Sequence, residues 1–255
     1  MPRDVAEDPV NFEETINSIT RLIAAVFIPM LPLALVYGAA DFLLLDFLMA
    51  REPDLTAPRQ VDPEIWAAVG GSALLGVFIT VVALIRAHNR HYYGATSLMS
   101  EIGLGLSRLP GMLIFIVIYA LLVGLGTAAL ILPGLFFAIL FLPGLTMVAL
   151  GQSGVLAAFG ESARLVWKQW WFSLGTVVLT VAAAMVGIAL IGVLLEIFLH
   201  EAQPQLSLAL LSLAAAIIWV PVSAGLLHTL PRALAARKAP PPPPEKPDDH
   251  GLFDD

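Results

Sequence analysis

The sequence has no cysteine among its 255 residues. Disulfide bonds, thiolate metal sites and cysteine nucleophiles are therefore excluded. Charge is also scarce, because only 13% of the residues are Asp, Glu, Lys or Arg, whereas 58% are apolar. Soluble domains usually have about 25% charged residues. Together with a mean hydropathy of +0.86, this composition excludes an ordinary water-soluble fold and indicates a membrane protein.

Six apolar blocks are long enough to cross a membrane as helices. A hydrocarbon layer of about 30 Å needs roughly 20 helical residues at about 1.5 Å each. The expected spans are residues 22–40 extending toward 50, 65–85, 110–132, 135–152, 173–199 and 206–230. We therefore predict an all-α fold, a polytopic helical membrane bundle with about six transmembrane helices.

The segments outside the predicted transmembrane domain, 22–230, differ in character. Residues 1–21 are predicted to be a cytoplasmic segment with an interfacial helix, since Asn11 and Glu14 have the spacing of a capping box. Residues 231–255 contain five consecutive prolines and several aspartates, so we expect a disordered, Pro-rich acidic tail in the cytoplasm.

The positive charges predict the orientation. Eleven of the thirteen Lys and Arg residues fall on the side of the two termini, and only Arg51 and Arg59 fall on the other. The positive-inside rule then places both termini in the cytoplasm of a bacterial inner (plasma) membrane. Asp41 and Glu196 would lie near the outer ends of their helices, where ionisable groups usually meet water.

Two cationic amphipathic connector helices are predicted on the cytoplasmic side, within residues 86–109 and 154–172. Tryptophans and tyrosines flank the charges, as is typical of a membrane interface. Anionic lipid headgroups attract such segments. The candidate headgroup contacts are Arg86, Arg90, Arg108, Arg164 and Lys168.

Pro143 and Gly144 predict a kink in the fourth span, because proline removes a backbone donor. Broken helices of this kind hold substrates in some transporters. Proline kinks are also common in packed bundles, so we interpret this one as structural and keep a small-molecule or ion transporter as the alternative.

No catalytic, cofactor or metal site is predicted. His88 and His91 have the spacing of two ligands on one helical turn, but no third ligand is evident. Phosphate-binding loops, nucleophile elbows and zinc-protease signatures are absent from the sequence. The acidic net charge of −7 also argues against nucleic acid as a partner.

A weak internal duplication is visible at an offset of 60 residues. Glu101 corresponds to Glu161, and Arg108 corresponds to Lys168, each pair preceding a span that rises from the same face. Parallel repeats of this kind occur in membrane proteins.

The stretch 131–171 resembles a bacterial family of multi-spanning proteins without assigned activity. That family includes YciC-like proteins and the membrane domain of some glycerophosphoryl diester phosphodiesterases. The matching residues are Leu132, Pro133, Gly134, Pro143, Ala158, Ser162, Leu165 and Trp170. Glu161 and Ala163 depart from the pattern, which usually has a basic residue and a tryptophan there. The resemblance implies a helical fold in a bacterial inner membrane and no known activity.

The sequence thus favours a non-enzymatic integral membrane protein that acts in membrane organisation or homeostasis. Membrane lipids are the expected partners, with a protein partner or a second copy of the chain as further options.

Overall fold

The computed structural model describes residues 11–50, 63–94, 96–199 and 204–238. No strand occurs in these residues. The elements in chain order are α1 (Phe12–Met49), α2 (Pro63–Tyr92), α3 (Leu98–Ala129), α4 (Ile131–Ala149), α5 (Val155–Val166), the short 3₁₀ helix η1 (Trp167–Gln169), α6 (Trp170–Leu199) and α7 (Pro204–Lys238).

Six of the helical runs are long and apolar enough to cross a membrane, with α5, η1 and α6 forming a single run. The predicted all-α bundle with six spans is confirmed, and the chain is a multi-pass membrane protein. Many apolar side chains remain exposed, such as Ile28 at 75% and Phe198 at 74%. Side chains of this kind are stable only where hydrocarbon, not water, surrounds the protein.

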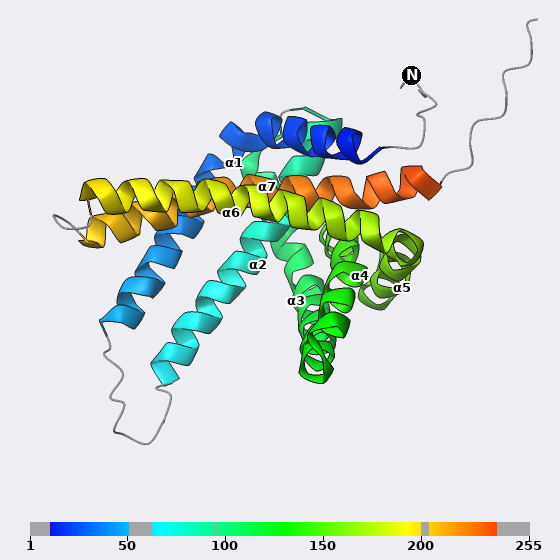
Figure 1. The fold of residues 1–255 in the computed structure, drawn as a ribbon, viewed down its shortest axis with the longest axis horizontal. Coiled ribbons are helices and arrows are strands. Elements are labelled where there is room, and N and C mark those ends of the chain that lie inside the picture. The colour runs from blue at the N-terminus through cyan, green and yellow to red at the C-terminus, as the bar shows by residue number, and fades with distance from the viewer. Residues whose placement is uncertain (1–10, 51–62, 95, 200–203, 239–255) are drawn as a thin grey trace, which may run out of the picture.

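The beginning of the chain differs from the prediction. From residue 11 onward, where the structure describes the chain, the expected interfacial helix is not a separate element, because α1 is one continuous helix from Phe12 to Met49. The predicted capping box is present, and the backbone amide of Asn11 donates to Oε2 of Glu14 at 2.9 Å. α1 changes direction along its length (Figure 1), as expected from Pro29 and Pro32 inside it.

The last helix also differs in length. α7 continues to Lys238, past the expected end of the sixth span at residue 230. The rest of the predicted tail, residues 239–255, lies outside the described residues.

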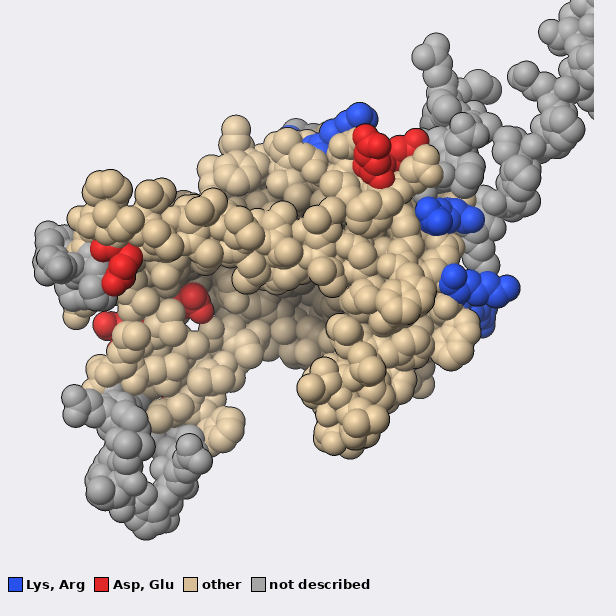
Figure 2. Space-filling view, viewed as in Figure 1, with Lys and Arg blue, Asp and Glu red and all other residues tan. Residues whose placement is uncertain are grey.

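The charges separate along the bundle, and the helices fan out from one end (Figure 1). Lys and Arg atoms gather there, with one group of acidic atoms beside them and other acidic atoms at the opposite side of the view (Figure 2). We call the region where α1 begins, α2 ends and α7 ends the basic end. Its basic residues include Arg21, Arg86, Arg90, Arg108, Arg164, Lys168, Arg232 and Arg237. The acidic residues Asp41, Asp46, Glu64 and Glu196 lie toward the opposite ends of their helices.

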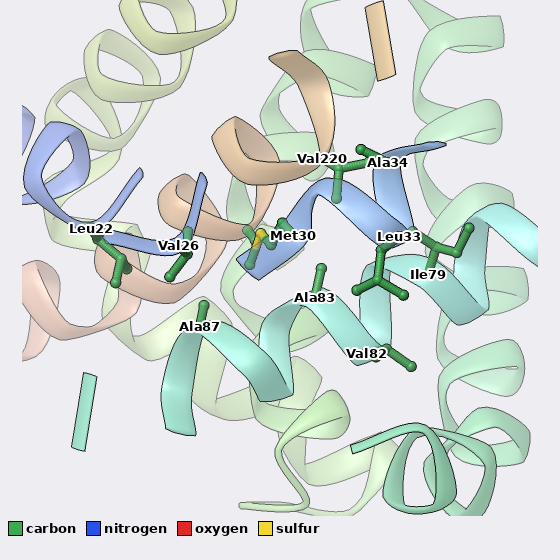
Figure 3. Packing of buried hydrophobic residues seen from close by; sticks show 11 residues of the cluster. Leu22, Val26, Met30, Leu33, Ala34, Ile79, Val82, Ala83, Ala87 and Val220 are labelled. Carbon is green, nitrogen blue, oxygen red and sulfur yellow. The ribbon is translucent and has the colours of Figure 1, made fainter. Parts of the chain in front are cut away.

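Three buried apolar clusters hold the bundle together. The first joins α1, α2 and α7 (Figure 3). In it, Val26 and Val82 are completely buried, and Met30 is 1% exposed. The second cluster joins α2, α3, α4, α5 and α7 around Phe115, and the third joins α1, α4, α5 and α7 around Leu230. Because α7 contributes to all three, it fixes the relative positions of the other helices at the basic end.

Candidate functional site

Arg86 is not available to a lipid headgroup. Its Nη1 lies 2.5 Å from Oε2 of Glu101, and the two side chains are 9% and 1% exposed. Asn89 donates to the other carboxylate oxygen at 3.4 Å, and the hydroxyl of Thr96 donates to it as well. The structure thus corrects the prediction for Arg86, because a buried and paired guanidinium joins α2 to α3 and does not face the membrane surface.

Arg108 lies against the turn between α4 and α5. Gly151 in this turn has a φ of +67°, and a Cβ at that position would collide with the Arg108 guanidinium. The left-handed backbone conformation favours glycine at this position. Arg108 is exposed, and its guanidinium covers this turn.

Arg164 and Lys168 lie on the outside of the protein, as the sequence predicted. Both side chains are exposed, and their neighbours Trp167 and Trp171 are 65% and 78% exposed. We call these four residues the connector surface. A cavity of about 600 Å³ separates Arg164 and Lys168 from Arg237 of α7. Exposed tryptophan beside cations is the composition of a membrane interface.

Aromatic residues of α4 and α6 pack next to the connector surface. The ring of Trp167 meets Phe136 of α4 edge to face, with the ring centroids 5.6 Å apart. Arg237 places its guanidinium 4.3 Å from the ring centroid of Phe172 at the start of α6. Aromatic contacts of this kind restrict the positions that the two tryptophans and the nearby cations can take.

Arg90 faces a second cavity at the basic end, which we call the arginine cavity. Residues of α1, α2 and α7 line it around a volume of about 680 Å³. Its three guanidinium groups come from helices that are far apart in the sequence. The lining residues are Thr15, Ser18, Arg21, Leu22, Ala25, Arg90, His91, Thr229, Arg232, Ala233 and Ala236.

His91, which lines the arginine cavity, belongs to a group of neighbouring histidine and tyrosine rings. His228 of α7 is 1% exposed, and its ring centroid lies 5.6 Å from those of His88 and His91. The structure therefore supplies a third histidine that the sequence spacing did not reveal. No group of three ligands suited to a metal ion occurs among the residues that the structure describes, and Arg232 places a further positive charge next to these rings.

The kink in α4 is closed by a side chain of α5. The Ser162 hydroxyl donates to the carbonyl oxygen of Leu140 at 2.8 Å and accepts from the amide of Gly144 at 3.2 Å. These two backbone groups are partners of one another in a regular helix. Pro143, Gly144 and Ser162 are buried, so the geometry supports the structural interpretation of this kink.

The residues that carry the family resemblance are mainly packing residues. Ala158 is completely buried beside Gly144, where a Cβ would meet the ring of Phe115. Gly134 is equally constrained, because a Cβ there would collide with the backbone of Thr127 in α3. Close approach of helices explains why small residues stand at these positions.

A cavity of about 550 Å³ lies in the middle of the bundle. Its lining comes from α1, α2, α3, α4 and α7 and is largely apolar, with Leu145 as the contribution of α4 and none from α6. A substrate site at the Pro143 kink would need polar groups that face a cavity, and Pro143 and Gly144 do not line this one.

The two halves of the weak duplication have different environments. Glu101 is buried and paired with Arg86, whereas Glu161 is exposed and accepts a hydrogen bond from Ser153 at 2.8 Å. Equivalent spacing therefore does not produce equivalent contacts.

Three basic residues of the basic end were missed as candidates. Arg21 and Arg232 contributed to the charge count that predicts orientation, but nothing in their spacing places them beside Arg90. Arg237 was likewise assigned to the tail. Comparison of the chain with protein-family models, with curated proteins and with solved structures finds no match.

Proposed function

We propose that the chain is a non-enzymatic protein of the bacterial inner membrane, with cytoplasmic termini, that acts through contacts with anionic lipids in membrane organisation. The observation that carries the proposal is the connector surface. Arg164 and Lys168 are exposed there beside two exposed tryptophans. Among the residues that the structure describes, neither cation has a carboxylate partner.

The charge distribution supports the orientation on which this proposal depends. The described Lys and Arg residues gather at the basic end and outnumber the four described acids found there, Glu13, Glu14, Glu101 and Glu161. The other four described acids lie toward the opposite ends of their helices. A cytoplasmic leaflet that contains anionic lipids attracts such a basic surface with about 1 kcal/mol for each Lys or Arg near it. The resemblance to the YciC-like family is compatible with this localisation.

Transport through a site at Pro143 is the less supported alternative. Ser162 meets the backbone groups at the kink, and the central cavity is lined mainly by apolar side chains. Both observations favour a packed helix over a substrate site.

Quenching of tryptophan fluorescence by brominated lipids tests the lipid preference. The chain has five tryptophans, and replacing Trp66 and Trp219 with phenylalanine leaves the three at the connector. In vesicles that mix phosphatidylcholine with phosphatidylglycerol, brominated phosphatidylglycerol should quench this fluorescence more strongly than brominated phosphatidylcholine. The double variant R164Q/K168Q should lower that preference about fivefold for each charge removed.

The matched control is the exchange R164K/K168R, which keeps both charges and should keep the preference. Equal quenching by the two brominated lipids in the parent protein, or an unchanged preference in R164Q/K168Q, contradicts the proposed function.

A further inference from the structure

The arginine cavity lies apart from the connector surface and has a lining of its own. We propose that it is a binding site for a phosphate monoester, carried either by a lipid headgroup or by a free phosphorylated compound. The argument rests on the charge, the donors and the size of the cavity. The site shares no residue with the connector surface, so either proposal can fail without the other.

The charge of the cavity calls for an anion. Arg21, Arg90 and Arg232 line it from three different helices, and no carboxylate is among the lining residues. Three guanidinium groups around one volume repel each other unless an anion joins them. The ion pair that the structure shows nearby belongs to Arg86 and Glu101 and does not reach the cavity.

The acidic residues on the helices that form the cavity do not neutralise its arginines. On α1, Glu14 is engaged by the backbone amide of Asn11, and Glu13 does not line the cavity. The acid of α2, Glu64, and the acids Asp41 and Asp46 of α1 are toward the opposite ends of their helices. The described part of α7 has no acidic residue at all.

The donors suit phosphate in particular. Each guanidinium offers a planar fork that can bind two phosphate oxygens at once. Ser18, Thr229 and His91 add hydroxyl and ring donors to the same lining. A phosphate monoester carries a charge of about −1.5 to −2 at neutral pH, which three arginines can balance.

Two of the arginines have guanidinium nitrogens that remain available for a ligand. The Arg232 guanidinium lies 4.7 Å from the ring centroid of Tyr92 and donates to its hydroxyl, which leaves its other nitrogens for a ligand. The Nε of Arg90 is buried and has no hydrogen-bond partner among the described residues. A donor held in place before binding loses less conformational freedom when the ligand arrives.

The size indicates that the phosphate is attached to something larger. About 680 Å³ lies within the range of about 300 to 1,000 Å³ for small-molecule sites, well beyond a bare phosphate ion. Leu22, Ala25 and Ala233 provide apolar walls. Arg21 and Arg232 are exposed, so the cavity can be reached from outside the bundle.

Calorimetric titration of the full chain in neutral detergent tests the site. The two probes are dihexanoyl phosphatidic acid and inorganic phosphate. We expect saturable binding of phosphatidic acid that weakens about tenfold or more in Arg90→Gln, because a charge-assisted hydrogen bond is lost. The matched control is Arg108→Gln, which removes a charge at the same end but outside the cavity and should bind as the parent does.

The two probes separate the sources of the phosphate. Displacement of phosphatidic acid by similar concentrations of inorganic phosphate assigns the site to a free phosphorylated compound, whereas no displacement assigns it to a lipid headgroup. Saturable binding of neither probe overturns the proposal, as does an Arg108→Gln protein that is weakened as much as Arg90→Gln.

A measurement without substitutions guards against variants that fail to fold. Phenylglyoxal modifies exposed arginines, and mass spectrometry reports the rate at each position. Phosphatidic acid should slow the modification of Arg21 and Arg232 severalfold and leave Arg108 unaffected. If phosphatidic acid leaves the modification rates of Arg21 and Arg232 unchanged, the proposed site is ruled out.

Discussion

Nη1 of Arg86 lies 2.5 Å from Oε2 of Glu101, within an interior that leaves their side chains 9% and 1% exposed. The pair joins the end of α2 to the first turn of α3. Thr96 and Asn89 complete the hydrogen bonds of the carboxylate, so the turn between the two helices is tied to a single buried group.

Glu101→Gln should therefore be strongly destabilising. It leaves the buried Arg86 guanidinium without a counter-charge, and breaking such a pair costs about 3–5 kcal/mol. The measurement is the free energy of unfolding in mixed detergent micelles titrated with dodecyl sulfate. The double variant R86M/E101Q should lose less than E101Q alone, since the unpaired charge is removed with its partner.

Glu161→Gln is the matched control for that experiment. Glu161 corresponds to Glu101 in the weak duplication but is exposed, so the free energy of unfolding should change by no more than about 0.5 kcal/mol. Similar losses at the two positions would mean that burial does not distinguish them.

Gly144→Ala should destabilise the packing of α4 against α3. A Cβ at this position would lie 2.6 Å from Cζ of the Phe115 ring, and overpacking of this kind costs about 1–3 kcal/mol. The same unfolding titration measures the loss. Adding Phe115→Leu should recover part of it, because the smaller side chain makes room for the methyl group.

Gly160→Ala in α5 provides the comparison. A Cβ there meets nothing within 4 Å, so the variant should be as stable as the parent or more stable by up to about 1 kcal/mol, the helix propensity difference. If Gly144→Ala is as stable as Gly160→Ala, the close packing at the α4 kink is refuted.

Reporter fusions test the orientation directly. An alkaline phosphatase or fluorescent protein joined after Glu52 should report the outside, and one joined after Glu245 should report the cytoplasm. The two sites are separated by five predicted spans. Reports from the same side would contradict the six-span layout and with it the lipid-facing role of the basic end.

The spans were predictable because apolar length is a local property. Twenty consecutive apolar residues identify a helix without any knowledge of its neighbours, and six such helices are present. The helix ends were less predictable, because α7 continues through Pro231 and the polar residues after it, where burial of Leu234 against other helices outweighs the local signal.

The candidate site was only partly predictable. The exposure of Arg164 and Lys168 follows from the amphipathic pattern of a single helix. The burial of Arg86 does not, because it depends on Glu101 in the next helix. The arginine cavity depends on three helices, and no spacing within one segment can show that Arg21, Arg90 and Arg232 face the same volume.

The pairing of α1 with α7 bears on how the chain matures. A Cβ at Gly38 would lie 2.9 Å from the backbone of Leu213, so the first and last helices pack tightly although almost the whole chain separates them. During synthesis the first span enters the bilayer long before its neighbour has been translated. Its buried face must then be shielded by lipid or by the insertion machinery until the final helix leaves the ribosome.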